Sequence, residues 1–89
     1  MKVRIKLYAL LATYLPDGAE KNEADIDVAD DASVQDVLNS RNLPDEHCHL
    51  VLVNGIYTPP SERPEKSVRE GDHIAVWPPW FSFVKHLLS

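Results

Sequence analysis

The sequence is poor in the residues that build cross-linked, metal-bound or membrane-spanning proteins. One cysteine in 89 residues excludes a disulfide framework and a zinc site made of several thiolates. The three glycines, at positions 18, 55 and 71, do not form a glycine-rich loop for phosphate binding. No apolar run approaches the roughly 20 residues that a membrane helix needs. The length leaves room for one domain.

Basic residues are outnumbered by acidic ones, nine against fourteen, and the net charge of -5 argues against nucleic acid as a general partner. Residues 1–15 hold three cations and no acid, whereas residues 16–46 hold ten acids and two cations. Because the first cations alternate with apolar residues, this segment is not typical of a secretory signal. We expect a cytoplasmic protein with no membrane span.

Two segments show the period-2 alternation of half-buried strands. Residues 2–7 alternate cationic and apolar side chains, and residues 23–28 alternate acidic and apolar ones. If these strands pair antiparallel, cations and acids meet across the exposed face, where each pair contributes about 0.2–1 kcal/mol. This pairing accounts for the uneven charge, and the alternative is an acidic patch for docking a partner. Residues 9–15, between the strands, are compatible with a short helix that a turn at residues 16–18 ends.

One main helix is predicted after residue 33. Ser33 and Asp36 have the spacing of a capping box. The apolar residues that follow have the i, i+3, i+4 spacing of a helix packed on a sheet: Val34, Val37 and Leu38. Pro44 ends the helix by about residues 42–43.

The second half of the chain predicts further strands. Residues 49–53 are nearly continuously apolar, which is typical of a strand covered on both faces. Asn54-Gly55 predicts a tight turn. Residues 58–66 are rich in proline and charge and predict a surface loop, and residues 73–77 predict a last strand that Pro78-Pro79 ends. This order predicts an α+β fold, with a mixed sheet of four to five strands on one main helix. One helix covers one face, so the apolar strand needs further cover from a tail, a second copy or a partner.

These elements resemble the MoaD/ThiS sulfur carriers, which are ubiquitin-like β-grasp proteins. Four motifs carry the resemblance: VRIKLYA at residues 3–9, SVQDVL at 33–38, LVNG at 52–55 and REGDHIAVWPP at 69–79. Residues 43–55 also resemble the ubiquitin-like domain that precedes PIN-like ribonuclease domains. The resemblance implies a β-grasp domain over residues 1–79, followed by an apolar tail at residues 80–89 that is compatible with a helix.

The resemblance also implies a chemistry that needs a Gly-Gly end. In the family an activating enzyme adenylates the terminal glycine carboxylate, which becomes a thiocarboxylate for molybdopterin or thiazole synthesis. Here Ser82-Phe83 stands where the glycines are expected, and no two glycines are adjacent. We therefore expect a non-catalytic protein-binding module linked to molybdenum or tungsten cofactor or sulfur-transfer metabolism. The alternative is a sulfur carrier of the molybdopterin synthase small-subunit type with an atypical end. For either function, the resemblance implies an adenylating enzyme or a synthase large subunit as a partner.

Aromatic residues near the end of the sequence are the predicted contact surface. We expect the protein to bind a partner or a second copy through the exposed sheet face together with Trp77, Pro78, Pro79, Trp80, Phe81 and Phe83. The apolar residues between 80 and 88 recur at roughly helical spacing, which also fits a tail that folds back on its own sheet. Insertion into a membrane surface is less favoured, because the tail carries only Lys85 and His86 as polar cations.

The motif His47-Cys48-His49 is a weak candidate for a metal or enzyme site. On an extended segment the two histidines share a face and Cys48 points away, so one ion cannot easily bind all three. No base or cation cluster beside Cys48 in the sequence activates it as a nucleophile. We therefore predict no catalytic residue, no metal and no cofactor.

Overall fold

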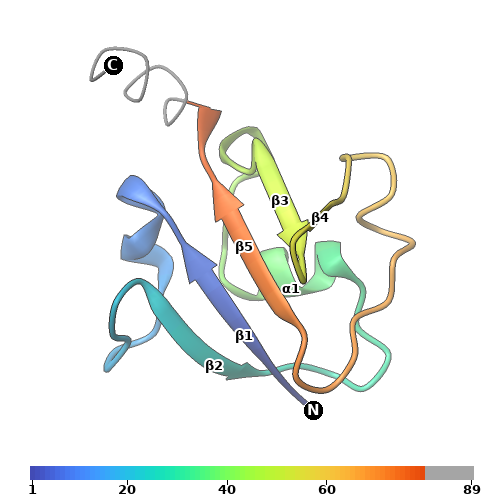
Figure 1. Ribbon diagram of the computed structural model, residues 1–89, viewed down its shortest axis with the longest axis horizontal. Coiled ribbons are helices and arrows are strands. Elements are labelled where there is room, and N and C mark those ends of the chain that lie inside the picture. The colour runs from blue at the N-terminus through green and yellow to red at the C-terminus, as the bar shows by residue number, and fades with distance from the viewer. Residues whose placement is uncertain (80–89) are drawn as a thin grey trace.

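The strands of the computed structural model, which describes residues 1–79, form one mixed sheet in the order β2-β1-β5-β3-β4 (Figure 1). The strands are β1 (Lys2–Leu7), β2 (Glu23–Asp27), β3 (Leu50–Val53), β4 (Ile56–Tyr57) and β5 (His73–Trp77). β1 and β5 pair in parallel, and the other neighbours pair antiparallel. The helices are α1 (Val34–Ser40) and two short 3-10 helices, η1 (Ala9–Tyr14) and η2 (Asp45–His47). The predicted α+β, β-grasp architecture is confirmed.

One face of the sheet packs on α1 and forms the core. The alternation in β1 places Val3, Ile5 and Leu7 on this face, where each is at most 1% exposed. The helix contributes the predicted stripe of Val34, Val37 and Leu38, all fully buried in the same cluster. Burying side chains of this size contributes about 1.5–3 kcal/mol each, so this face supplies most of the stability of the fold.

The predicted pairing of the first two strands is confirmed, ion pairs included. Lys2 lies opposite Asp27, Arg4 opposite Asp25 and Lys6 opposite Glu23. The charged atoms of these facing pairs are 3.2, 3.1 and 3.6 Å apart, and Arg4 also reaches Glu23 at 3.3 Å. The hydrogen bond from Arg4, supported by the charge of Lys6, lowers the pKa of the Glu23 carboxyl.

The local signals for helix and turn are confirmed as well. The amide of Asp36 donates to Ser33 Oγ at 3.1 Å, and the amide of Ser33 donates to the Asp36 carboxylate at 2.9 Å. Asn54 and Gly55 have φ values of 52° and 84°, the left-handed conformation that a two-residue hairpin turn requires. The turn therefore fixes the register of β3 against β4.

Residues 1–79 cover only one face of β3 completely. Val51 and Val53 are buried against the helix side, whereas Leu50 and Leu52 are only partly buried. The reason is that α1 covers one face of the sheet. The apolar side chains of β3 on the other face therefore remain accessible in the described part of the chain.

The prediction of a surface loop over residues 58–66 is wrong for Thr58 and Arg63, which are 1% and 3% exposed. The Arg63 guanidinium donates to the carbonyl of Thr58 at 3.0 Å, to that of Cys48 at 2.7 Å and to that of His49 at 3.4 Å. The guanidinium joins the residues just before β3, Cys48 and His49, to Thr58 just after β4. A buried cation thus ties the loop to the sheet.

Within residues 1–79, no helix is both long enough and apolar enough to cross a membrane. The predicted apolar tail at residues 80–89 lies outside the described residues, so its folding stays a prediction.

Candidate protein-binding surface

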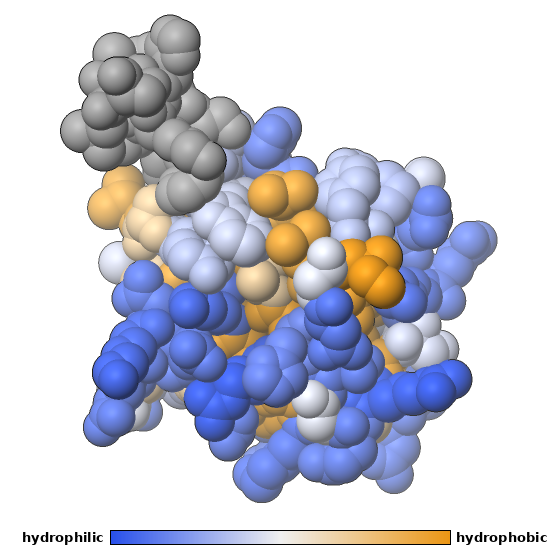
Figure 2. Space-filling model, in the orientation of Figure 1, coloured by the Kyte–Doolittle hydropathy of each residue, from blue (hydrophilic) through white to orange (hydrophobic). Residues whose placement is uncertain are grey.

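The sheet face opposite α1, which we call the outer face, is charged on one side and apolar on the other. The charged half lies on β1 and β2, where three cations and three acids pair with one another. The apolar half lies over β5, β3 and β4. Figure 2 looks onto this face: orange and pale residues gather in its upper half, and blue ones dominate its lower half.

Six side chains from four parts of the chain form the apolar half. Leu50 lies opposite Trp77, and Leu52 lies between Ala75 and Tyr57 in the register of the sheet. We call the set the outer-face patch: Tyr8, Leu50, Leu52, Tyr57, Ala75 and Trp77. All six are at least partly exposed, and Tyr57 is 50% exposed. The strands hold these side chains on a rigid surface, so a partner would meet them with little loss of conformational entropy.

An aromatic stack fixes one end of the outer-face patch. The rings of Tyr8 and Trp77 lie 4.1 Å apart between centroids and only 9° from parallel. Such a pair contributes about 0.5–1.5 kcal/mol beyond the area it buries. Lys6 lies 5.3 Å from the centre of the Tyr8 ring, and its pKa is raised, chiefly by its hydrogen bond with the Tyr8 side chain. The stack therefore fixes both aromatic side chains at this end of the patch, with the Lys6 ammonium over the Tyr8 ring.

The structure describes three of the six predicted contact residues. Trp77 is partly buried and belongs to the outer-face patch, and Pro79 is exposed. Pro78 is fully buried within the chain. The other three, Trp80, Phe81 and Phe83, lie outside the described residues.

A family model described as Mut7-C ubiquitin matches residues 1–84. The chain belongs to this family. The match covers nearly all of the sequence and confirms the predicted resemblance to ubiquitin-like proteins. A search of curated proteins finds none that matches.

Solved structures share the fold of this Mut7-C ubiquitin domain. Two crystal structures of small archaeal modifier protein 1 (SAMP1) from Haloferax volcanii superpose with TM-scores of 0.61 and 0.64, at 25% and 26% identity. They cover 89% and 88% of this chain, and 96% and 97% of theirs. A putative molybdopterin converting factor subunit 1 from Pyrococcus furiosus has a TM-score of 0.60 at 21% identity, covering 88% of this chain and 97% of its own. That last likeness shows the fold alone.

Sequence reasoning missed most of the outer-face patch of the Mut7-C ubiquitin domain. The signal for Tyr8 was present, since continuing the alternation of residues 2–7 by one position places it beside the cations. The continuous apolar run of β3 also implied that Leu50 and Leu52 face away from the core. Tyr57 gave no such signal, because a strand of two residues shows no alternation.

The candidate metal and nucleophile motif forms no such site among residues 1–79. The structure groups no three His, Cys, Asp or Glu side chains that could hold a metal ion in this part of the chain. Cys48 is buried, and its thiol lies 3.5 Å from the Pro44 carbonyl. Burial raises the pKa of Cys48 to about 11, against the opposing charge of Arg63. The thiol is therefore protonated at neutral pH, which does not suit a nucleophile.

Proposed function

We propose that this domain is a non-catalytic protein-binding module and that the outer-face patch is its contact surface. The observation that carries the proposal is the cluster of six apolar and aromatic side chains, each at least partly exposed, on one face of the sheet. Large aromatic side chains at the centre of such a surface are typical anchors of protein interfaces. The lone cysteine is a free thiol, which fits the expected cytoplasmic location.

The charge pattern of the outer face supports binding by apolar burial. Its cations and acids neutralise one another, because each cation pairs with an acid across β1 and β2. Exposed pairs of this kind contribute only about 0–1 kcal/mol, so they do not dominate association. The partner we infer has an apolar or aromatic surface of its own, either on a second copy of this chain or on another protein.

The structural neighbours support a setting for this binding. SAMP1 is named a modifier protein, a name that describes a protein acting together with others, and the sequence motifs of this chain resemble those of the MoaD/ThiS sulfur carriers. We infer the same for this chain, in molybdenum or tungsten cofactor or sulfur-transfer metabolism. An adenylating enzyme or a synthase large subunit is a partner of the right kind.

The test replaces exposed patch residues and measures association. We expect Leu52→Gln and Tyr57→Gln each to weaken binding at least about tenfold, because burying such a side chain contributes about 1.5–3 kcal/mol. Sedimentation over a range of protein concentrations measures self-association. Calorimetry measures the affinity for a co-purified and identified partner.

Leu10→Gln is the matched control, since Leu10 is 70% exposed, lies on η1 and lines a separate hollow with Leu11 and His47. Thermal unfolding followed by circular dichroism shows whether each variant keeps its fold. If both patch variants associate as tightly as the unaltered protein, the outer face is not the contact surface.

The contact surface we propose extends to the predicted aromatic residues near the end of the sequence. Replacing Trp80 and Phe81 together by alanine is expected to reduce the mass of the complex in solution. Unchanged association with a lower melting temperature would instead support a tail that packs on its own domain.

The second candidate is a sulfur carrier with an atypical end, which the likeness to SAMP1 favours. Incubation with a cognate activating enzyme, ATP and a sulfur donor tests it by mass spectrometry. A carrier gains the mass of one sulfur-for-oxygen exchange at its terminal carboxylate. Neither adenylate nor thiocarboxylate is expected, because no two glycines of the sequence are adjacent.

A further inference from the structure

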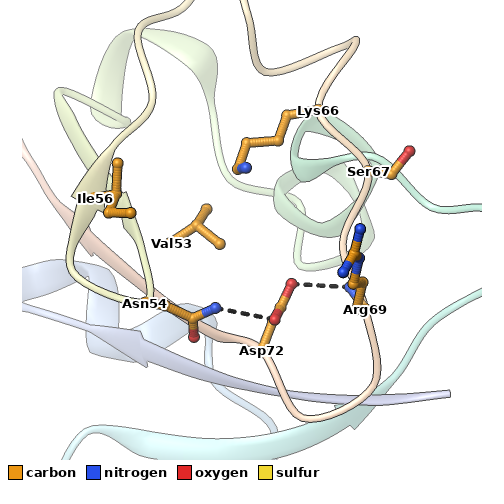
Figure 3. Close-up of a pocket in the computed structure, with 7 residues that line it drawn as sticks. All are labelled: Val53, Asn54, Ile56, Lys66, Ser67, Arg69 and Asp72. Carbon is orange, nitrogen blue, oxygen red and sulfur yellow. Dashed lines mark hydrogen bonds between the residues drawn. The ribbon is translucent and has the colours of Figure 1, made fainter.

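A hollow of about 400 Å³ lies on the other side of the β3–β4 hairpin from the outer-face patch. Figure 3 shows it between the hairpin, which contributes Val53 and Ile56, and the loop before β5, which contributes Lys66 and Arg69. Val53 and Ile56 are direct partners in the register, so both side chains are on the helix side of the sheet. The size is within the range of roughly 300–1,000 Å³ that ligand sites span.

The two cations of this hollow have no acidic partner in the described part of the chain. Neither Lys66 nor Arg69 forms a side-chain ion pair or hydrogen bond among residues 1–79. The cations of β1 form ion pairs. The guanidinium groups of Arg41 and Arg63 donate hydrogen bonds to backbone carbonyls. Among residues 1–79, Lys21 is the one other lysine or arginine whose side chain forms neither an ion pair nor a hydrogen bond, and it lies in the turn before β2. The hollow thus holds two cations without an ion pair, and Asp72 is the one carboxylate among its lining residues.

The wall beside these cations is apolar and rigid. Val53 is buried and Ile56 is 70% exposed, so the hollow offers apolar surface at its edge. Asp72 is held in place by the Asn54 side-chain amide at 3.0 Å and by the Arg69 backbone amide at 2.8 Å. These bonds fix the hairpin turn against the loop and keep the hollow open.

We propose that this hollow binds a protein segment in which a carboxylate side chain neighbours an apolar one. The carboxylate lies between Lys66 and Arg69, and the apolar side chain packs on Ile56 and Val53. The site is independent of the outer-face patch, since the two surfaces lie on opposite faces of the hairpin.

The charges favour a single carboxylate over a phosphate group. Asp72 lies on the rim of the hollow, and its negative charge repels a dianion more strongly than a monoanion. The net charge of -5 acts in the same direction over longer distances. At physiological salt that field is screened beyond about 8 Å, so Lys66 and Arg69 dominate for a group that has entered the hollow.

The test is a nuclear magnetic resonance titration of the full, isotope-labelled chain. The probe is a tetrapeptide of alternating leucine and glutamate, acetylated and amidated at its ends. We expect it to shift the backbone amides of Ile56, Arg69 and Asp72 and the side-chain amide of Asn54. The same peptide with glutamine in place of glutamate is expected to bind at least about fivefold more weakly, because it lacks the ion pairs.

Matched variants locate the interaction. Lys66→Gln and Arg69→Gln together are expected to raise the dissociation constant about tenfold, and Ile56→Ser to raise it several-fold. Lys21→Gln, which removes the charge of an exposed cation elsewhere, is expected to leave it unchanged. Leu52→Gln alters only the outer face and is also expected to leave the dissociation constant of the peptide unchanged. This variant therefore distinguishes a failure of the hollow from a failure of the proposed contact surface.

Three results would overturn the proposal. The first is a peptide that shifts none of the amides at the hollow, and the second is binding that persists unchanged in the double variant. The third is inorganic phosphate that shifts the same amides at lower concentration than the peptide, which would identify a general anion site. The dispersion of the amide spectrum shows that each variant is folded, and all the altered side chains except Leu52 are well exposed.

Discussion

Replacing Arg63 by alanine tests whether a buried cation holds the long loop to the sheet. In the structure the guanidinium is bonded to the carbonyls of Cys48, His49 and Thr58 and forms no ion pair within residues 1–79. Alanine removes all three donors and leaves the carbonyl groups in a region that water reaches poorly. It also leaves a cavity where the side chain lay.

The expected loss is large for a domain of this size. Each buried carbonyl left without its donor costs about 1–3 kcal/mol, so the loss of all three donors costs at least about 3 kcal/mol. A domain of this length is stable by about 5–15 kcal/mol, and each kcal/mol lost lowers its melting temperature by about 4–8 °C. Arg63→Ala is therefore expected to melt at least about 12 °C below the unaltered protein.

Urea unfolding followed by circular dichroism and tryptophan fluorescence measures the free energy of unfolding. Arg63→Lys keeps the charge but replaces the guanidinium fork, so its expected loss is intermediate. Arg69→Ala is the control, since Arg69 is exposed and should change stability by no more than about 0.5 kcal/mol. A loss below about 1 kcal/mol for Arg63→Ala would refute the role assigned to this side chain.

Two further predictions concern the helix cap and the buried thiol. Ser33→Ala breaks the capping box and should cost about 1 kcal/mol by thermal unfolding, whereas Ser61→Ala in the exposed loop should cost almost nothing. Equal losses in these two variants would contradict the cap. Cys48 has its pKa raised to about 11 from an ordinary value of 9.0, so the folded protein holds the thiol proton longer than the unfolded chain does. The resulting stability is complete below pH 9 and is lost as the pH rises toward 11, by about 2 kcal/mol at pH 10.5. Urea unfolding at pH 8 and pH 10.5 measures how much free energy of unfolding each protein loses between the two pH values. The unaltered protein should lose more than Cys48→Ala, and equal losses would contradict the effect of the buried thiol.

Most of the fold could be predicted because its signals are local. The alternation of β1, the cap at Ser33 and the turn at Asn54-Gly55 each depend on neighbours within a few residues. The element over residues 9–15 was expected as a short helix, and it forms a 3-10 helix. A six-residue segment between two strands gains little from longer helical hydrogen bonding.

The site could be predicted only in part, because its pieces meet through the fold. Trp77 was expected at the contact surface, yet its stacking partner Tyr8 comes from the first strand and meets it only through the parallel pairing of β1 and β5. The bonds of Arg63 to Cys48 span 15 residues. The hollow at Ile56 and Lys66 joins a hairpin to a loop that composition alone described as surface.

The two borders of the sheet restrict how copies of this protein can associate. At one border β2 carries Glu23, Asp25 and Asp27, so a second β2 approaching side by side would bring like charges together. At the other border β4 has only two residues and is soon followed by Pro59 and Pro60, which offer no amide to a further strand. Both borders are therefore poor templates for the continuous sheets of aggregates. The protein can keep apolar side chains open to partners without polymerising through its strands.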